Sequence, residues 1–231
     1  MTDSALREIA DDPSSRKRFF KMLGGAGAVG AATVLIAACG DDKKTTATTS
    51  ARATTTPEAN NASDLKIVNY ALTLEYLEAT FYQEVLDSGV IKDKKIGDLA
   101  KGLAAAEQQH VEALIATAKS LGGTPAAKPM TKFQDTIAKG ADTILMTAAT
   151  VENLGAAAYL GQAGNIKSRD ILAAALSIHS VEARHAAALN ELVGRGFGGR
   201  GGLEGSLPDG AFGKPMDMAA VLKAVAPFIA G

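Results

Sequence analysis

Four segments of this chain have the periodicity of amphipathic helices, and each places a glutamate inside its own apolar stripe. The interrupting residues, one for each segment in chain order, are Glu75, Glu107, Glu152 and Glu182. Each lies near the middle of its segment, so burial of the stripes also buries all four carboxylates. Without positive partners, their burial would cost far more than the roughly 5 to 15 kcal/mol by which a domain is stable. The sequence therefore predicts a positive charge inside the core.

Histidines follow two of these glutamates at the same interval, in the motifs Glu107-x-x-His110 and Glu182-x-x-His185. Residues three apart lie on one face of a helix, so each motif can offer a carboxylate and an imidazole to the same metal ion. The two motifs and the two lone glutamates predict the ligand set of a carboxylate-bridged pair of metal ions inside a four-helix bundle. Two divalent cations would balance four carboxylates and two neutral imidazoles.

Glycine and proline mark the connections between the four segments. Residues 122–129 hold two glycines and two prolines and indicate a longer connection between the second and third segments, whereas residues 161–165 indicate a short one before the fourth. The chain beyond the N-terminal region is long enough for one four-helix core. We therefore predict an all-α fold with a short C-terminal helix over residues 216–229. The preceding glycine-rich stretch, residues 194–213, is interpreted as a connector without an anion- or nucleic-acid-binding role.

Two further residues leave the size of the ligand set open. Glu78 lies one turn after Glu75 on the shoulder of the stripe, where the sequence is compatible with a metal ligand, a partner of a ligand or a solvated residue. His179 lies one turn before Glu182 and about a quarter turn off the line to His185, which favours a polar contact between helices over a seventh ligand. We place both residues outside the predicted set.

The stretch from Leu65 to Val193 resembles a ferritin-like domain of the bacterioferritin and rubrerythrin type, in which a lone glutamate and a Glu-x-x-His motif alternate twice along the chain. The resemblance implies a ferritin-like antiparallel four-helix bundle. It also implies that Glu107 and Glu182 bridge the two ions, that each histidine binds one ion, and that the two lone glutamates cap the pair. The order and spacing are most similar to those of small exported ferritin-like proteins of bacteria, rather than to those of storage ferritins that form cages.

Two tyrosines lie near the lone glutamates. Tyr82 follows Glu75 by seven residues, which is similar to the pattern of the first helix in this family. The resemblance implies that Tyr82 donates a hydrogen bond near the metal ligands. Tyr159, two turns after Glu152, is expected to be an ordinary core residue.

The same resemblance implies a pair of iron or manganese ions that reacts with dioxygen or hydrogen peroxide. Carboxylate-rich sites with two histidines suit both metals, and zinc satisfies the same charge balance, so the residues do not choose among them. The implied functions are consumption of peroxide and oxidation of ferrous iron outside the cytoplasmic membrane, as a protection against stress. A surface-anchored structural or binding protein without turnover is the alternative, because the sequence holds no Cys-x-x-Cys segment of a module that would return electrons.

The N-terminal region predicts export and a lipid anchor. Residues 1–38 are similar to the twin-arginine (Tat) signal peptide of a lipoprotein, except that Lys17 occupies the position of the second arginine. The sequence Ile36-Ala37-Ala38-Cys39 resembles a lipobox, which implies cleavage before Cys39 and lipidation of that residue.

Residues 39–63 are rich in threonine and alanine and cannot build a core. We expect them to form a flexible tether that holds a domain of residues 64–231 at the outer face of the cytoplasmic membrane. Ser63 or Asp64 is the expected N-cap of the first helix.

Charge and cysteine content narrow the range of partners. The 24 basic and 25 acidic residues leave a net charge of −1, which gives no footprint for nucleic acid. The single cysteine excludes an intrachain disulfide. The expected partners are metal ions, a small oxidant and the membrane, and the sequence leaves the oligomeric state open.

Overall fold

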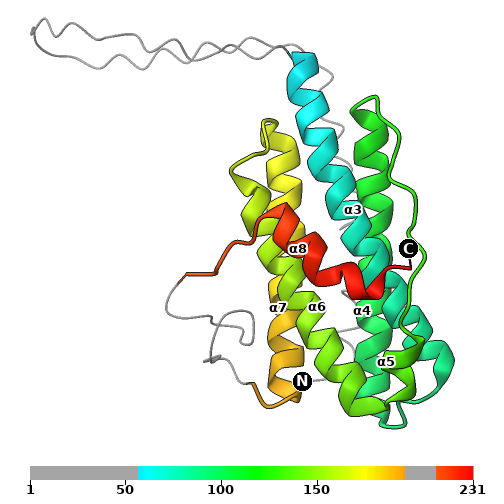
Figure 1. The fold of residues 1–231 in the computed structure, drawn as a ribbon. Coiled ribbons are helices and arrows are strands. Elements are labelled where there is room, and N and C mark those ends of the chain that lie inside the picture. The colour runs from blue at the N-terminus through cyan, green and yellow to red at the C-terminus, as the bar shows by residue number, and fades with distance from the viewer. Residues whose placement is uncertain (1–56, 196–211, 231) are drawn as a thin grey trace, which may run out of the picture.

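The computed structural model describes residues 57–195 and 212–230 (Figure 1). The predicted signal, Cys39 and most of the predicted tether lie outside the described residues, as does most of the glycine-rich connector. Within the described ranges, the regular elements are α-helices and one 3-10 helix, which confirms the predicted all-α fold.

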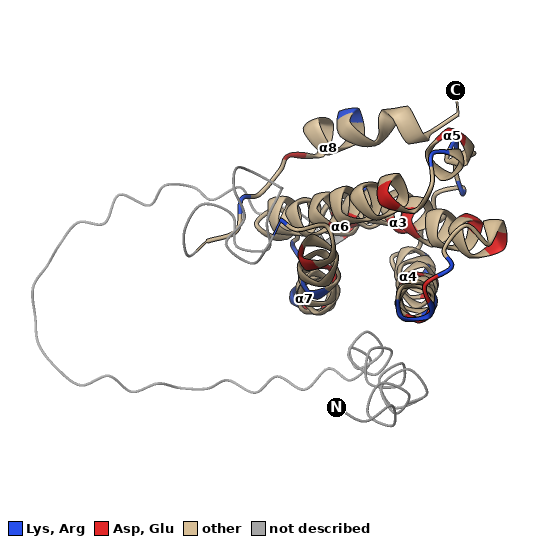
Figure 2. Ribbon diagram, turned by 90° about the horizontal axis from the view of Figure 1, so that it is seen from below, with Lys and Arg blue, Asp and Glu red and all other residues tan. Residues whose placement is uncertain are grey.

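Four long helices form the bundle. They are α3 (Pro57–Ser88), α4 (Lys94–Ser120), α6 (Ala141–Ala163) and α7 (Arg169–Leu192), with the short helix α5 (Gln134–Ala138) between α4 and α6. α3 packs along α4, α6 packs along α7, and further contacts join α3 to α6 and α4 to α7. Figure 2 shows the α6–α7 pair beside the α3–α4 pair. The predicted four-helix bundle is therefore confirmed.

The connection between α4 and α6, residues 121–140, runs along the length of the bundle (Figure 1). Gly123, just after α4, lies against Leu65 near the start of α3. Thr131, further along the connection, donates a hydrogen bond to Glu84 near the end of α3. α4 and α6 therefore run in the same direction, and each long helix is antiparallel to the helices that it packs against.

The first helix differs from the prediction at its start. α3 begins at Pro57, so the expectation that Ser63 or Asp64 caps this helix is wrong, and residues 57–63 are helical instead of part of a flexible tether. Asp64 is buried and accepts hydrogen bonds from the backbone N–H groups of Lys167 and Ser168, both at 2.8 Å. This carboxylate joins α3 to the start of α7, a partner more than 100 residues away that no local pattern reveals.

The C-terminal segment covers one face of the bundle. α8 (Met218–Val225) and the 3-10 helix η2 (Ala226–Phe228) lie within the predicted C-terminal helix, and α8 packs across α6 (Figure 1). Phe228 stacks on Phe133 of the α4–α6 connection, with 5.4 Å between ring centroids. The carbonyl of Phe228 accepts a hydrogen bond from the backbone N–H of Lys132 at 2.9 Å. The segment is thus fixed to the bundle through both side chains and backbone.

Buried apolar side chains form two clusters, one that includes Tyr82 and one that includes Tyr159. No helix in residues 57–195 or 212–230 has both the length and the apolar character that crossing a membrane requires.

Candidate metal centre

Each long helix contributes one glutamate whose side chain is completely buried. Glu75 on α3, Glu107 on α4, Glu152 on α6 and Glu182 on α7 are all 0% exposed. The side chains of His110 and His185 are 12% and 15% exposed, respectively. The structure thus brings all six residues of the predicted ligand set together in the middle of the bundle.

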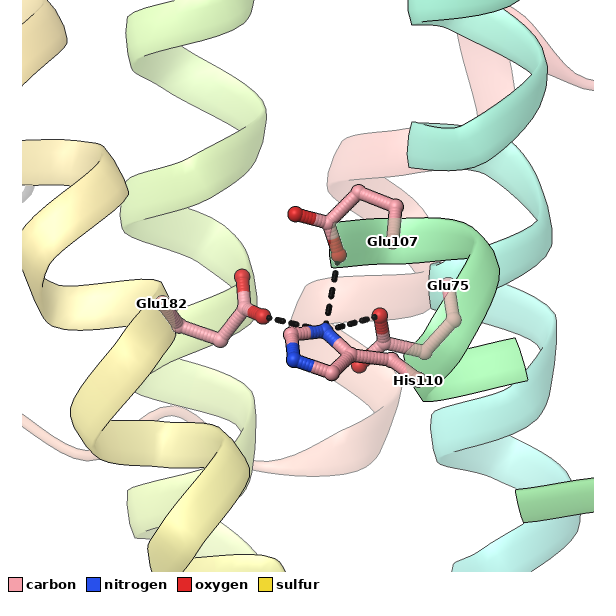
Figure 3. A group of neighbouring side chains, drawn as sticks. All are labelled: Glu75, Glu107, His110 and Glu182. Atoms are coloured by element: carbon pink, nitrogen blue, oxygen red, sulfur yellow. Dashed lines mark hydrogen bonds and ion pairs between the residues drawn. The ribbon is translucent and has the colours of Figure 1, made fainter. Parts of the chain in front are cut away.

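His110 lies at the centre of the first half of the site (Figure 3). Its Nδ1 is 2.9 Å from Oε2 of Glu107, 3.2 Å from Oε2 of Glu75 and 3.1 Å from Oε1 of Glu182. Ligand atoms of these four residues, which come from three helices, all lie within 4.8 Å of one another. One cation with metal–ligand distances of about 2.0 to 2.4 Å can span such a group.

The second half of the site is built in the same way around His185. Its Nδ1 lies 2.8 Å from Oε1 of Glu107 and 3.2 Å from Oε2 of Glu152. Together with Glu182, these residues form a second group whose ligand atoms lie within 4.8 Å of one another. Glu107 and Glu182 belong to both groups, so their carboxylates lie where they can bridge two ions. The two imidazole rings, one for each group, stack with 6.4 Å between their centroids.

Two buried tyrosines orient the glutamates that belong to only one group. The hydroxyl of Tyr82 on α3 donates to Oε1 of Glu152 on α6, and the hydroxyl of Tyr159 on α6 donates to Oε1 of Glu75 on α3, both at 2.5 Å. Tyr82 therefore contacts a predicted ligand. Tyr159, expected to be an ordinary core residue, makes the equivalent contact. The sequence does contain a signal for it, since Tyr159 follows Glu152 at the same seven-residue interval that separates Tyr82 from Glu75.

Several ligand atoms lie close to one another without forming hydrogen bonds. Oε1 of Glu107, Oε2 of Glu152, Nδ1 of His185 and both carboxylate oxygens of Glu182 are buried without a hydrogen-bond partner among the described residues. Buried polar atoms normally have partners, and clustered carboxylates repel one another. Cations bound by these atoms would satisfy the unpartnered oxygens and remove the repulsion. Carboxylate and imidazole are ligands that iron, manganese and zinc accept, so the residues fit a pair of divalent cations.

Protons compete with metal ions for this site. Burial and the nearby Glu152 raise the pKa of Glu107 to about 7. Burial and Glu107 raise the pKa of Glu182 well above its usual range. Burial opposes the charged form of His185, but the carboxylates of Glu107 and Glu152 outweigh it and raise the pKa of the imidazole to about 10. Binding of metal ions at neutral pH therefore has to displace protons from these side chains.

Glu78 and His179, the two residues outside the predicted ligand set, lie in different surroundings. Glu78 is buried beside the site, 4% exposed, and its Oε2 has no hydrogen-bond partner in the described part of the chain. Burial, followed by the charge of Glu182, raises its pKa well above the usual range. His179 also has a buried Nδ1 without a partner in the described residues. Neither Glu78 nor His179 belongs to the two groups of ligand atoms. Cys39, the predicted lipidation site, lies outside the described residues.

Comparison with known protein families agrees with this architecture. The family model of the ferritin-like domain matches residues 63–195, which is more than half of the chain. The matched region runs from within α3 to the end of α7 and contains all six residues of the predicted ligand set. A search of curated proteins gave no match. The chain therefore belongs to the ferritin-like domain family.

Proposed function

We propose that this protein binds a carboxylate-bridged pair of iron or manganese ions and reacts with peroxide or dioxygen, or oxidises ferrous iron, as a protection against stress. In this proposal it is an exported, membrane-anchored member of the bacterioferritin and rubrerythrin type. The observation that carries the metal centre is the pair of buried ligand groups that overlap at Glu107 and Glu182. A pair of divalent cations would balance the four carboxylates and supply partners for their unpaired oxygens.

The six ligand residues would divide between two ions. Glu107 and Glu182 would bridge, His110 and Glu75 would complete one set, and His185 and Glu152 would complete the other; these are the two groups that the structure brings together. A pair of iron or manganese ions held there would supply two-electron redox chemistry toward a small oxidant.

The chain itself contributes orientation, protons and exclusion of water. Burial and the charge of Glu152 raise the pKa of Tyr82 well above its usual range, and burial and Glu75 do the same for Tyr159. Both hydroxyls therefore stay protonated and keep donating to their glutamates across the bundle. Each bond holds one carboxylate oxygen and leaves the other facing a histidine, which preserves the arrangement of the site.

Among the proposed reactions, disproportionation of hydrogen peroxide requires the fewest additional components. One peroxide molecule is oxidised to dioxygen and a second is reduced to water, so the reaction needs no external reductant. A chain with one cysteine cannot contain a Cys-x-x-Cys electron-transfer segment, and this reaction does not require one.

The proposed location rests on the N-terminal sequence. The signal-like residues 1–38 and the lipobox-like Ile36-Ala37-Ala38-Cys39 support export and a lipid anchor at Cys39. A tether after Cys39 would place the bundle at the outer face of the cytoplasmic membrane.

Peroxide turnover by the loaded full-length chain tests this function. The chain is loaded separately with Mn²⁺ and with Fe²⁺ under anaerobic conditions, freed of excess metal and mixed with hydrogen peroxide, while peroxide loss and dioxygen release are followed. We expect turnover by the wild-type chain and by Glu191→Gln, a change on the exposed face of α7. We expect none from Glu107→Gln. A wild-type chain that holds two ions but leaves peroxide, dioxygen and added ferrous iron unchanged would favour the alternative, a surface-anchored structural or binding protein.

A further inference from the structure

A fifth buried carboxylate lies beside the proposed metal centre without an assigned role. Glu78 is on α3, one turn after Glu75, and is 4% exposed. Its Oε2 is buried and has no hydrogen-bond partner in the described part of the chain. A carboxylate buried in this way, with an oxygen left unpaired, requires either a proton or a cation.

The opposite helix leaves room for this side chain. A Cβ atom added to Gly155 on α6 would lie 2.9 Å from Oε1 of Glu78 and 3.1 Å from Oε2 of Glu182, both closer than a side chain normally permits. The carboxylates of Glu78 and Glu182 thus approach the same point on α6. The oxygen of Glu182 that lies nearest this point, Oε2, has no hydrogen-bond partner in the described residues.

The sequence places this extra carboxylate on only one of two otherwise similar helices, α3 and α6. Glu78 follows Glu75 by three residues on α3, and Gly155 follows Glu152 by three residues on α6. The two helices are otherwise alike around the site, because each carries a lone glutamate and a tyrosine seven residues later. At the equivalent position one helix has a carboxylate and the other has no side chain, so the glycine makes space for one extra carboxylate.

The surroundings of Glu78 offer it little water. A cavity of about 10 Å³, close to the size of one water molecule, borders Glu78 and Gly155 beneath the C-terminal segment. Apart from Glu78, the residues lining this cavity are apolar or glycine, and Phe133 and Phe228 are among them. The cavity has room for one water molecule at most, and its other walls offer that water no polar partner, so it does little to hydrate the carboxylate of Glu78.

We propose that Glu78 is a seventh ligand residue of the metal centre and binds a metal ion on the side of Glu182, in the space that Gly155 leaves. This assignment rests on the proposed function, since it requires the centre to hold metal ions. The charges are consistent with it, because two divalent ions carry four positive charges and two trivalent ions carry six. Relative to four carboxylates, a fifth therefore stabilises the oxidised pair more than the reduced pair.

Titration with Co²⁺ tests the assignment without relying on catalysis. The full-length wild-type chain is compared with Glu78→Gln, which keeps the shape and removes the charge, and with Glu58→Gln, the same change at an exposed position on α3. We expect Glu78→Gln to bind one of its two Co²⁺ ions roughly 10 to 100 times more weakly. We also expect the visible absorption of bound Co²⁺ to become more intense, because intensity rises as the number of ligands falls. Glu58→Gln should match the wild type.

A second variant reaches the same carboxylate without changing its charge. Gly155→Ala places a methyl group where Glu78 and Glu182 converge and should weaken Co²⁺ binding at least as much as Glu78→Gln does. Gly102→Ala on α4, where an added Cβ meets no atom within 4 Å, is the matched control. Circular dichroism establishes that each variant is folded.

The outcomes separate the two proposals. If the wild-type chain binds two Co²⁺ ions and Glu78→Gln binds both with unchanged affinity and spectrum, Glu78 is a neutral buried acid, which glutamine replaces without loss, and the assignment is overturned. If the wild-type chain takes up no Co²⁺, the metal centre itself is overturned, and the role of Glu78 falls with it.

Discussion

Replacement of either shared glutamate, as Glu107→Ala or Glu182→Ala, is expected to lower the metal content of the chain from two ions to none. Each of these carboxylates belongs to both ligand groups and is completely buried. Loss of one carboxylate therefore removes a ligand from both ions at once. It also leaves the two dications with one fewer negative charge, in a core where water cannot take the place of the missing carboxylate.

Replacement of a histidine is expected to have a smaller effect on the metal content than replacement of a shared glutamate. His110→Ala and His185→Ala each remove a ligand from only one group, so these variants are expected to keep about one ion per chain. Glu191→Ala, on the exposed face of α7, should keep both. Elemental analysis after gel filtration gives the metal content, and circular dichroism checks the fold. Equal loss from Glu107→Ala and His110→Ala would refute the bridging role of Glu107.

The thermal stability of the metal-free chain is expected to fall as the pH rises from 5 to 9. Glu107 and His185 have folded-state pKa values of about 7 and about 10, above the ordinary values of 4.5 and 6.5. A group with a raised pKa stabilises the fold below its unfolded pKa, and this contribution is lost as the pH rises through the folded pKa. The losses fall between 4.5 and about 7 for Glu107 and between 6.5 and about 10 for His185.

Glu75 changes the stability of the fold with pH in the opposite direction, but only below pH 4.5. Burial alone would raise the pKa of Glu75, yet His110, with the hydrogen bonds that Glu75 accepts, holds it below the ordinary value of 4.5. Its contribution is therefore complete above 4.5 and is lost only at more acidic pH. The decline between pH 5 and 9 should therefore be visible without compensation from Glu75.

Bound metal is expected to reverse this trend. Metal ions require ionised carboxylates and neutral imidazoles, so their affinity rises with pH as the protons leave. At a free concentration one hundred times the Kd, each ion stabilises the fold by about 2.7 kcal/mol. Melting curves from pH 5 to 9, recorded with a chelator and with Mn²⁺, measure both effects. A chain whose Tm rises toward pH 9 in chelator and does not respond to Mn²⁺ would contradict the proposed centre.

Much of the fold and of the site could be predicted because buried charge has few explanations. A glutamate inside an apolar stripe has to find positive charge, and the two Glu-x-x-His motifs supply metal ligands on the same face of a helix. This argument uses only local periodicity, so it located the four helices and the residues that the structure brings together.

The features that the sequence did not reveal depend on contacts between distant residues. Glu78 lies on the shoulder of its stripe, and its burial follows from the close approach of α6 at Gly155. Tyr159 suits an apolar stripe as well as any aromatic residue, and only its partner on α3 shows its role. The start of α3 was missed because Asp64, a good N-cap residue in isolation, is used in a contact with the start of α7.

The metal content of the wild-type chain tests the central claim most directly. The full-length protein is purified from cells supplied with both iron and manganese, freed of loosely bound metal by gel filtration and submitted to elemental analysis. The paired ligand groups predict close to two ions of iron or manganese per chain. A folded chain that carries no metal, and takes up none after anaerobic incubation with excess Fe²⁺ or Mn²⁺, would contradict the account.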